Sequence, residues 1–139
     1  MGVRRRGREL AVQMLYQHEL AGTDFERIIA GFEDLEEAPP AAKEFAIVLV
    51  RGVLHRRDQI DAALGSQADH WRLDRMAAVD RNILRLAIFE LLHHPDTPPA
   101  VVIDEAVELA KRFGSERSSQ FVNGVLDGFV HRQIAPGTG

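Results

Sequence analysis

The chain has 139 residues, of which 45% are hydrophobic and 27% charged, and its formal net charge is −4. This length suits one compact domain or two small subdomains with a buried core. The absence of cysteine excludes disulfide bonds and thiolate metal sites. The longest strongly apolar run, Phe45 to Val50, is far too short to cross a membrane, so we expect a cytoplasmic protein.

Apolar residues recur every three or four positions along almost the whole chain, which predicts helices throughout. The first helix is expected over about residues 4–20, with Gly22 as its C-terminal stop. Thr23 and Glu26 have the spacing of a capping box, which opens a second helix with an apolar face from Phe25 to Leu35. A third helix is expected over about 41–57 and a short one over about 58–64.

A boundary between two subdomains is expected within residues 65–70. The predicted organisation is a helical subdomain over 1–66, a second over 67–133, and a disordered tail at 134–139. Trp71, just after the boundary, is interpreted as a hydrophobic anchor that closes a subdomain.

Four residues in the second half of the chain indicate where helices begin or pack closely. Asp74 is a candidate cap for a long helix that ends near residue 92, and Pro99 suits the first turn of the next helix. Ser115 is a candidate cap for the last helix, at about 116–130. Gly124 lies inside that helix, where glycine costs about 1 kcal/mol, so we expect tight packing against a neighbouring helix. Short loops between these helices predict an all-α fold of two packed antiparallel bundles, about seven helices in all.

Positive charge is concentrated at the N-terminus. Residues 1–18 contain Arg4, Arg5, Arg6 and Arg8 with a single acidic residue, a formal +3, which leaves −7 for the rest of the chain. Guanidinium groups match phosphate oxygens and stack on unpaired bases, and the start of a helix adds N–H donors. Tyr16, about two turns after Arg8, offers a ring for stacking. The alternative is a solvated basic terminus beside a half-buried core tyrosine.

The sequence gives no pattern typical of catalysis, metal binding or a cofactor. The six histidines lack metal-ligand spacing, and Ser118 and Ser119 lack the strand–turn–helix context of a nucleophile. Asp104, Glu105 and Glu108 are interpreted as a solvated helix face. We therefore expect a binding protein and not an enzyme.

Three segments together resemble the NusB transcription antitermination family: RRRGRELAVQMLYQHEL, AAVDRNILRLAIFELL and PPAVVIDEAVELAKRFGSERSSQFVNGVLDGF. The resemblance covers nearly the whole chain in order and spacing. It implies an all-α fold of two perpendicular helical bundles. It also implies binding of single-stranded boxA RNA together with the ribosomal protein NusE, which helps RNA polymerase pass terminators, notably in ribosomal RNA operons.

The resemblance also assigns roles to residues. Arg4, Arg5, Arg6 and Arg8 match the family's arginine-rich RNA-binding motif, and Tyr16 matches a tyrosine near the RNA. Asp80 and Phe121 match positions associated with the RNA and NusE surface. Arg117 stands where the family often has an acidic residue, so it is expected to strengthen phosphate contact if that position faces RNA.

Two other functions remain open on the sequence alone. One is a NusB-like RNA-binding module of an RNA methyltransferase, which would require a cofactor-binding domain in the same chain; the start at Met1 is interpreted as evidence against such a fragment. The other is a structural helical protein without RNA binding. A homodimer is also left open, because core stripes and interface stripes look alike in sequence.

Overall fold

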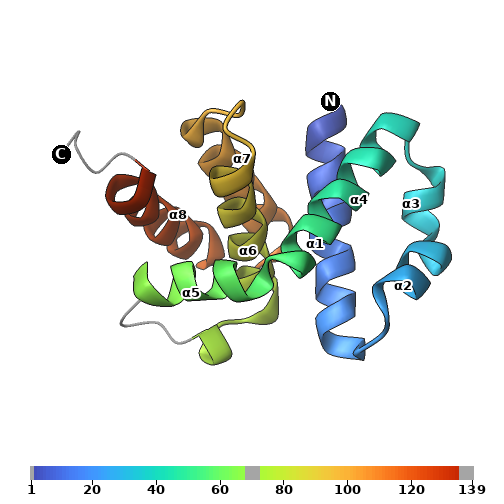
Figure 1. The fold of residues 1–139 in the computed structure, drawn as a ribbon, viewed down its shortest axis with the longest axis horizontal. Coiled ribbons are helices and arrows are strands. Elements are labelled where there is room, and N and C mark those ends of the chain that lie inside the picture. The colour runs from blue at the N-terminus through green and yellow to red at the C-terminus, as the bar shows by residue number, and fades with distance from the viewer. Residues whose placement is uncertain (1, 68–72, 135–139) are drawn as a thin grey trace. The chain divides into compact units, whose positions relative to one another are not determined.

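A computed structural model describes residues 2–67 and 73–134 of the chain. Over these ranges the chain forms eight α-helices, a short 3-10 helix and a closing π-helical turn, with no strand (Figure 1). The all-α prediction is therefore confirmed. Trp71 and residues 135–139 of the expected tail lie outside the described residues. None of the described helices is long and apolar enough to cross a membrane.

The chain divides into two compact units, Met1–His55 (unit 1) and Arg56–Gly139 (unit 2). The division falls after His55, not after residue 66, because the helix that follows it packs on helices of unit 2.

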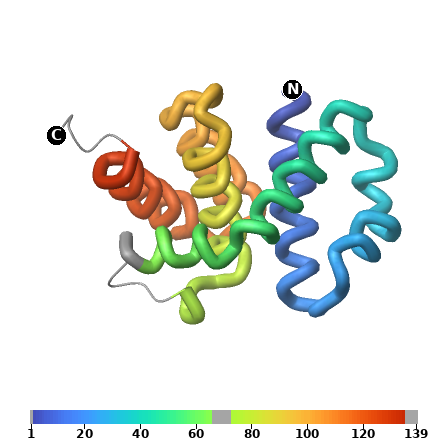
Figure 2. Tube along the Cα trace, viewed as in Figure 1, coloured from blue at the N-terminus to red at the C-terminus, as the bar shows by residue number. Residues whose placement is uncertain are grey.

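Unit 1 contains α1 (Val3–Ala21), α2 (Phe25–Gly31), α3 (Glu33–Glu37) and α4 (Pro40–His55). Helices α1 and α4 lie side by side, and α2 also packs on α1 (Figure 2). Both long helices bury apolar residues at helical spacing, which gives each a stripe that faces the core. These residues are Leu10, Ala11, Met14 and Leu15 of α1 and Ala42, Ala46, Leu49, Val50 and Val53 of α4.

Unit 2 contains α5 (Arg57–Gln67), the 3-10 helix η1 (Leu73–Arg75), α6 (Ala78–His93), α7 (Pro99–Phe113), α8 (Ser118–Phe129) and the π-helical turn η2 (Val130–Ile134). Helix α6 contacts α5, α7 and α8, and α7 also packs on α8. Every residue of α6 from Asn82 to Leu91 is buried. Helix α6 is therefore the central helix of unit 2.

The predicted capping box at Thr23 is wrong. The N-cap of α2 is Asp24, whose carbonyl accepts from the N–H groups of Arg27 and Ile28 at 3.1 and 3.2 Å. The Thr23 carbonyl accepts from His18 Nδ1 at 2.9 Å, and Glu26 pairs with Arg51 of α4. Neither side chain is placed to close the box.

The second helix is also shorter than predicted, because the chain breaks at Phe32. This residue has an extended backbone (φ −89°, ψ 98°) and separates α2 from α3. It follows Gly31, and glycine lowers helix propensity at that point.

Two further capping predictions are wrong. Asp74 belongs to η1, and α6 begins only at Ala78, because Arg81 binds the carbonyls of Leu73 and Met76 and holds the chain in a turn. At the other site, α8 begins at Ser118 with Arg117 as its N-cap. There the Ser115 N–H donates to Ser118 Oγ at 2.9 Å, so the serine hydroxyl that accepts a backbone hydrogen bond is that of Ser118 and not that of Ser115.

The predicted close packing at Gly124 is wrong as well. A Cβ built on Gly124 meets no heavy atom within 4 Å, and the residue is exposed. A glycine that does lie within a helix and against a neighbouring one is Gly7 of α1, beside Phe45 of α4. Other start and stop signals are confirmed, since Pro99 opens α7 and Gly22, at φ 64°, ends α1.

Candidate nucleic-acid interface

The arginine motif, residues 4–8, lies inside the first two turns of α1 and not in a tail before it. The helix begins after Gly2, whose backbone is extended (φ −73°, ψ 143°), and the Arg6 N–H donates to the Gly2 carbonyl at 3.2 Å. Arginine is a good helix former, so the motif continues this turn without strain. The arginine side chains are therefore presented at helical spacing.

The four arginines differ in how far they reach solvent. Arg4 is exposed, Arg5 and Arg6 are half-buried, and Arg8 is only 4% exposed. Arg6 also lies 3.4 Å from Glu9, which partly offsets its charge. Direct contact with a phosphate chain is therefore open mainly to Arg4, Arg5 and Arg6.

Arg8 is instead enclosed beside an aromatic ring. Its guanidinium carbon lies 5.6 Å from the centre of the Phe45 ring on α4, and that of Arg4 lies 5.7 Å from the same centre. Both distances fall within the range of a cation–π interaction. A single ring thus receives two of the four cations of the motif.

The start of α1 adds a backbone contribution to this positive surface. Gly2 offers no side chain to cap the helix, and the first turn contains no acidic residue. The first N–H groups of a helix lack partners within it and carry the positive end of the helix dipole. Arginines and N–H donors therefore favour an anion at the same place.

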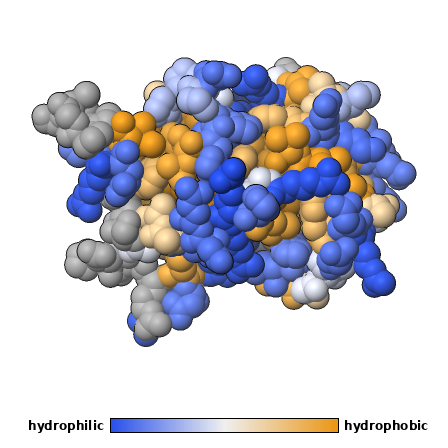
Figure 3. All heavy atoms as spheres, viewed as in Figure 1, coloured by the Kyte–Doolittle hydropathy of each residue, from blue (hydrophilic) through white to orange (hydrophobic). Residues whose placement is uncertain are grey.

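Tyr16 lies on the same helix, further from the motif. Its side chain is 38% exposed, and Leu20, one turn later, is 61% exposed. An exposed aromatic ring is a suitable platform for an unstacked base. In residues 2–65 and 73–134, few other large hydrophobic side chains are as exposed as these two. Hydrophobic patches also lie between hydrophilic residues on the face drawn in Figure 3.

Three predicted site residues lie in unit 2. Arg117 is exposed at the start of α8, and Phe121, half-buried, follows one turn later, with its N–H donating to the Arg117 carbonyl at 3.1 Å. These two side chains therefore share one side of α8. Asp80 lies in the first turn of α6, and its Oδ1 is buried with no hydrogen-bond partner in the described part of the chain.

Comparison with known proteins identifies the fold family. A sequence model of the NusB family matches residues 5–131. The chain belongs to the NusB family. A transcription antitermination protein NusB from Myxococcus xanthus (strain DK1622) is 52% identical over 131 residues, which cover 91% of this chain and 94% of that protein.

Solved structures of the NusB family match as well. T. maritima NusB is 44% identical with a TM-score of 0.82, covering 91% of this chain and 89% of that one. A crystal structure of the antitermination factors NusB and NusE in complex with double-stranded RNA contains a chain that is 30% identical. Its TM-score is 0.83, and the match covers 95% of this chain and 98% of that chain.

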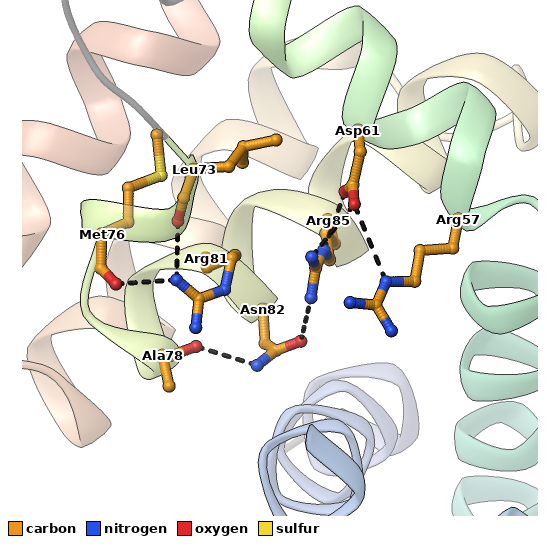
Figure 4. A network of polar contacts seen from close by, with 8 residues as sticks. All are labelled: Arg57, Asp61, Leu73, Met76, Ala78, Arg81, Asn82 and Arg85. Carbon is orange, nitrogen blue, oxygen red and sulfur yellow. Dashed lines mark hydrogen bonds and ion pairs between the residues drawn. The ribbon is translucent and has the colours of Figure 1, made fainter. Parts of the chain in front are cut away.

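In this member of the NusB family, two more arginines are used inside the fold. The Nη1 group of Arg81 donates to the carbonyls of Leu73 and Met76, at 2.6 and 2.8 Å, and thereby fixes η1 against α6. Arg85 points to Asp61 of α5, and Figure 4 shows both guanidinium groups directed at their partners. These cations support the fold of unit 2 and are not part of the exposed basic surface.

Histidines form a small cluster at the end of α6. The rings of His93 and His94 both pack on Phe89, with centroid distances of 5.3 and 5.2 Å, and His93 Nε2 lies 3.2 Å from Gln59 Oε1. Burial lowers the pKa of His93 below its usual 6.5, and the nearby charges of Arg56 and His94 lower it further. The described residues contain no group of three or more side chains placed to hold a metal ion.

Sequence reasoning missed Phe45 and Gly7 as parts of the site. In the sequence Phe45 is one residue of an apolar stripe, and its arginine partners lie in a distant segment. The glycine inside the arginine motif is a weak signal, because Gly124, which also lies inside a helix, has no close neighbour. Of the residues that the sequence singles out in α1, Arg4 and Tyr16 are exposed.

Proposed function

We propose that this protein is a transcription antitermination factor that binds boxA-type single-stranded RNA together with the ribosomal protein NusE, notably in ribosomal RNA operons. The observation that carries the proposal is the arginine motif in the first turns of α1, with Arg4 exposed and Arg5 and Arg6 partly exposed, in a chain of the NusB family. The protein would act in the cytoplasm, as part of the RNA polymerase antitermination complex.

The arginines and the start of α1 supply the electrostatic part of RNA binding. Each phosphate contact releases counterions, so the affinity falls as salt rises. Arg4, Arg5 and Arg6 make these contacts because their side chains reach solvent. Tyr16 stacks on an unpaired base, and this stacking adds a contribution to the binding free energy that depends much less on salt.

Unit 2 supplies the partner surface and further RNA contacts. Arg117 binds phosphate, and Phe121 packs against a base or against NusE. Asp80, in the first turn of α6, contacts NusE or the RNA through its carboxylate. A partner that enlarges the RNA surface raises RNA affinity, and RNA raises the affinity for the partner by the same factor.

The two other functions are less well supported. The match spans 94% of the length of an antitermination protein, which favours this function over a module of an RNA methyltransferase. The surface exposure of Arg4 and Tyr16 favours RNA binding over a purely structural role. A homodimer that covers α1 would compete with RNA, so sedimentation velocity should accompany the binding experiment.

The test is fluorescence anisotropy with a short boxA-like RNA, with and without NusE, from about 50 to 200 mM salt. The same RNA as a duplex and a scrambled single strand are the RNA controls. The double variant R4A/R5A should bind more weakly with a shallower salt dependence, whereas Arg27→Ala, which removes an exposed arginine of α2, should not. No binding by the folded wild-type protein, with NusE or without, would favour a structural helical protein.

A further inference from the structure

Phe45 and the arginine motif form one contact between α4 and α1. The guanidinium carbons of Arg4 and Arg8 lie 5.7 and 5.6 Å from the centre of the Phe45 ring. These arginines are four residues apart, so both project from the same face of α1. The ring is therefore shared between an exposed cation and a buried one.

Gly7 allows the ring to come this close. A Cβ added at Gly7 would lie 2.7 Å from Phe45 Cδ2 and 3.1 Å from the Ala42 carbonyl oxygen. Real Cβ atoms essentially never approach a heavy atom to less than 3.0 Å. The glycine thus places the backbone of α1 directly against the ring, between the two arginines in sequence.

The contact leaves part of the Arg4 guanidinium open to a ligand. A guanidinium interacts with a ring mainly through its face, while its N–H donors point outward in its own plane. Arg4 is exposed, so these donors reach solvent while the ring limits the rotamers of the side chain. A long side chain that is already ordered loses less entropy when it binds phosphate.

We propose that Phe45 is a positioning residue for RNA binding, which holds the guanidinium groups of Arg4 and Arg8 on one ring in the geometry that phosphate contact requires. This inference rests on the proposed function. Phe45 itself does not contact the RNA. Arg8, at 4% exposure, contributes its charge from below the surface, and Arg4 makes the direct contact.

The test compares three variants. Phe45→Leu keeps an apolar side chain but removes the ring, Phe45→Tyr keeps the ring, and Phe32→Leu makes the same chemical change at another half-buried phenylalanine of unit 1. The RNA affinity should fall about tenfold in Phe45→Leu, because two long side chains lose their order. It should stay near the wild-type value in Phe45→Tyr and in Phe32→Leu.

A double-variant cycle separates positioning from a general loss of structure. In an Arg4→Ala background, Phe45→Leu should cause a much smaller loss of RNA affinity, because the cation that makes the direct contact is already gone and only buried Arg8 remains on the ring. An equal loss in both backgrounds would overturn the proposal. So would wild-type affinity in a folded Phe45→Leu variant.

A second measurement needs no RNA. The side-chain Nε–Hε signals of Arg4 and Arg8 in NMR spectra, assigned with single Arg→Lys variants, should shift in Phe45→Leu and remain in place in Phe32→Leu. Unmoved signals would overturn the positioning role. Failure of the wild-type protein to bind RNA would overturn the proposed function instead, so the two failures are distinguishable.

Discussion

The guanidinium of Arg85 on α6 spans the carboxylate of Asp61 on α5, donating from Nε to Oδ1 at 2.8 Å and from Nη2 to Oδ2 at 3.0 Å. The Arg85 side chain is 6% exposed and that of Asp61 is 25% exposed. Arg57 lies 3.7 Å from the same carboxylate, and Arg85 also donates to Asn82 Oδ1 at 3.4 Å. This two-pronged ion pair joins α5 to the central helix of unit 2.

Loss of the Asp61 charge should destabilise the protein. Asp61→Asn leaves a buried guanidinium without its counter-charge, and we expect the free energy of unfolding to fall by about 2–3 kcal/mol. Asp58→Asn, an exposed change on the same helix, is the matched control and should have little effect. Urea denaturation followed by circular dichroism measures both. Equal midpoints for the two variants would contradict the role given to the ion pair.

Two glycines in helix interiors should respond to alanine in opposite ways. Gly124→Ala adds a Cβ in open space, so the gain in helix propensity should raise the free energy of unfolding by about 0.5–1 kcal/mol. Gly7→Ala gains the same propensity but forces the Phe45 ring away, at a cost of about 1–3 kcal/mol. Thermal melting should therefore show a higher Tm for Gly124→Ala and a lower one for Gly7→Ala. A rise in both would show that the ring moves without cost.

Arg5 and Arg8 should give different defects when each is changed to alanine. Arg5→Ala should flatten the salt dependence of RNA binding by about 0.7 in log–log slope for each phosphate that Arg5 neutralises, with little change in Tm. Arg8→Ala removes a buried side chain that packs on Phe45, so it should lower the free energy of unfolding by about 1–3 kcal/mol. Anisotropy and denaturant titration on both variants separate the two effects. If Arg8→Ala changes RNA binding alone, its burial has no structural role.

The stability of the protein should fall slightly as the solution becomes acidic. The pKa of His93 is below its usual 6.5 in the folded protein, so the unfolded chain takes up the proton first as the pH falls. The stability that neutral His93 contributes is present above pH 6.5 and is lost as the pH falls through the lowered pKa. Urea midpoints at about pH 7.5 and about pH 5.5 should therefore differ less in His93→Gln than in the wild type. An identical difference in both would assign the effect to other groups.

The sequence predicts those features of the fold that depend on local chemistry. Gly22 ends α1 and Pro99 begins α7 as predicted. A glycine in the left-handed conformation ends a helix, and a proline suits the first turn of one. The predicted caps at Thr23, Asp74 and Ser115 are wrong, because a cap depends on which donors and acceptors the folded backbone leaves nearby. Those partners come from elsewhere, as in the hydrogen bond from His18 and those from Arg81.

The candidate site is predictable to a similar extent. A cluster of arginines at a helix start indicates an anion surface without any knowledge of the fold. The sequence does not separate Arg8, which is buried, from Arg4, which is exposed, because the difference depends on the position of α4. The same holds for Gly7: only the folded structure, with the Phe45 ring beside the backbone of α1, shows that a side chain has no room at this position.

The helical conformation of residues 4–8 sets a fixed pitch for the basic side chains. Arg4 and Arg8 are one turn apart, about 6 Å along the helix axis. A disordered basic segment can adapt the positions of its arginines to any polyanion. A helix holds its arginines at fixed positions, so it contacts several anionic groups at once only when their spacing matches that of the arginines. We therefore expect the spacing of a ligand's anionic groups, and not its charge alone, to decide how many of the exposed arginines of α1 it contacts at once.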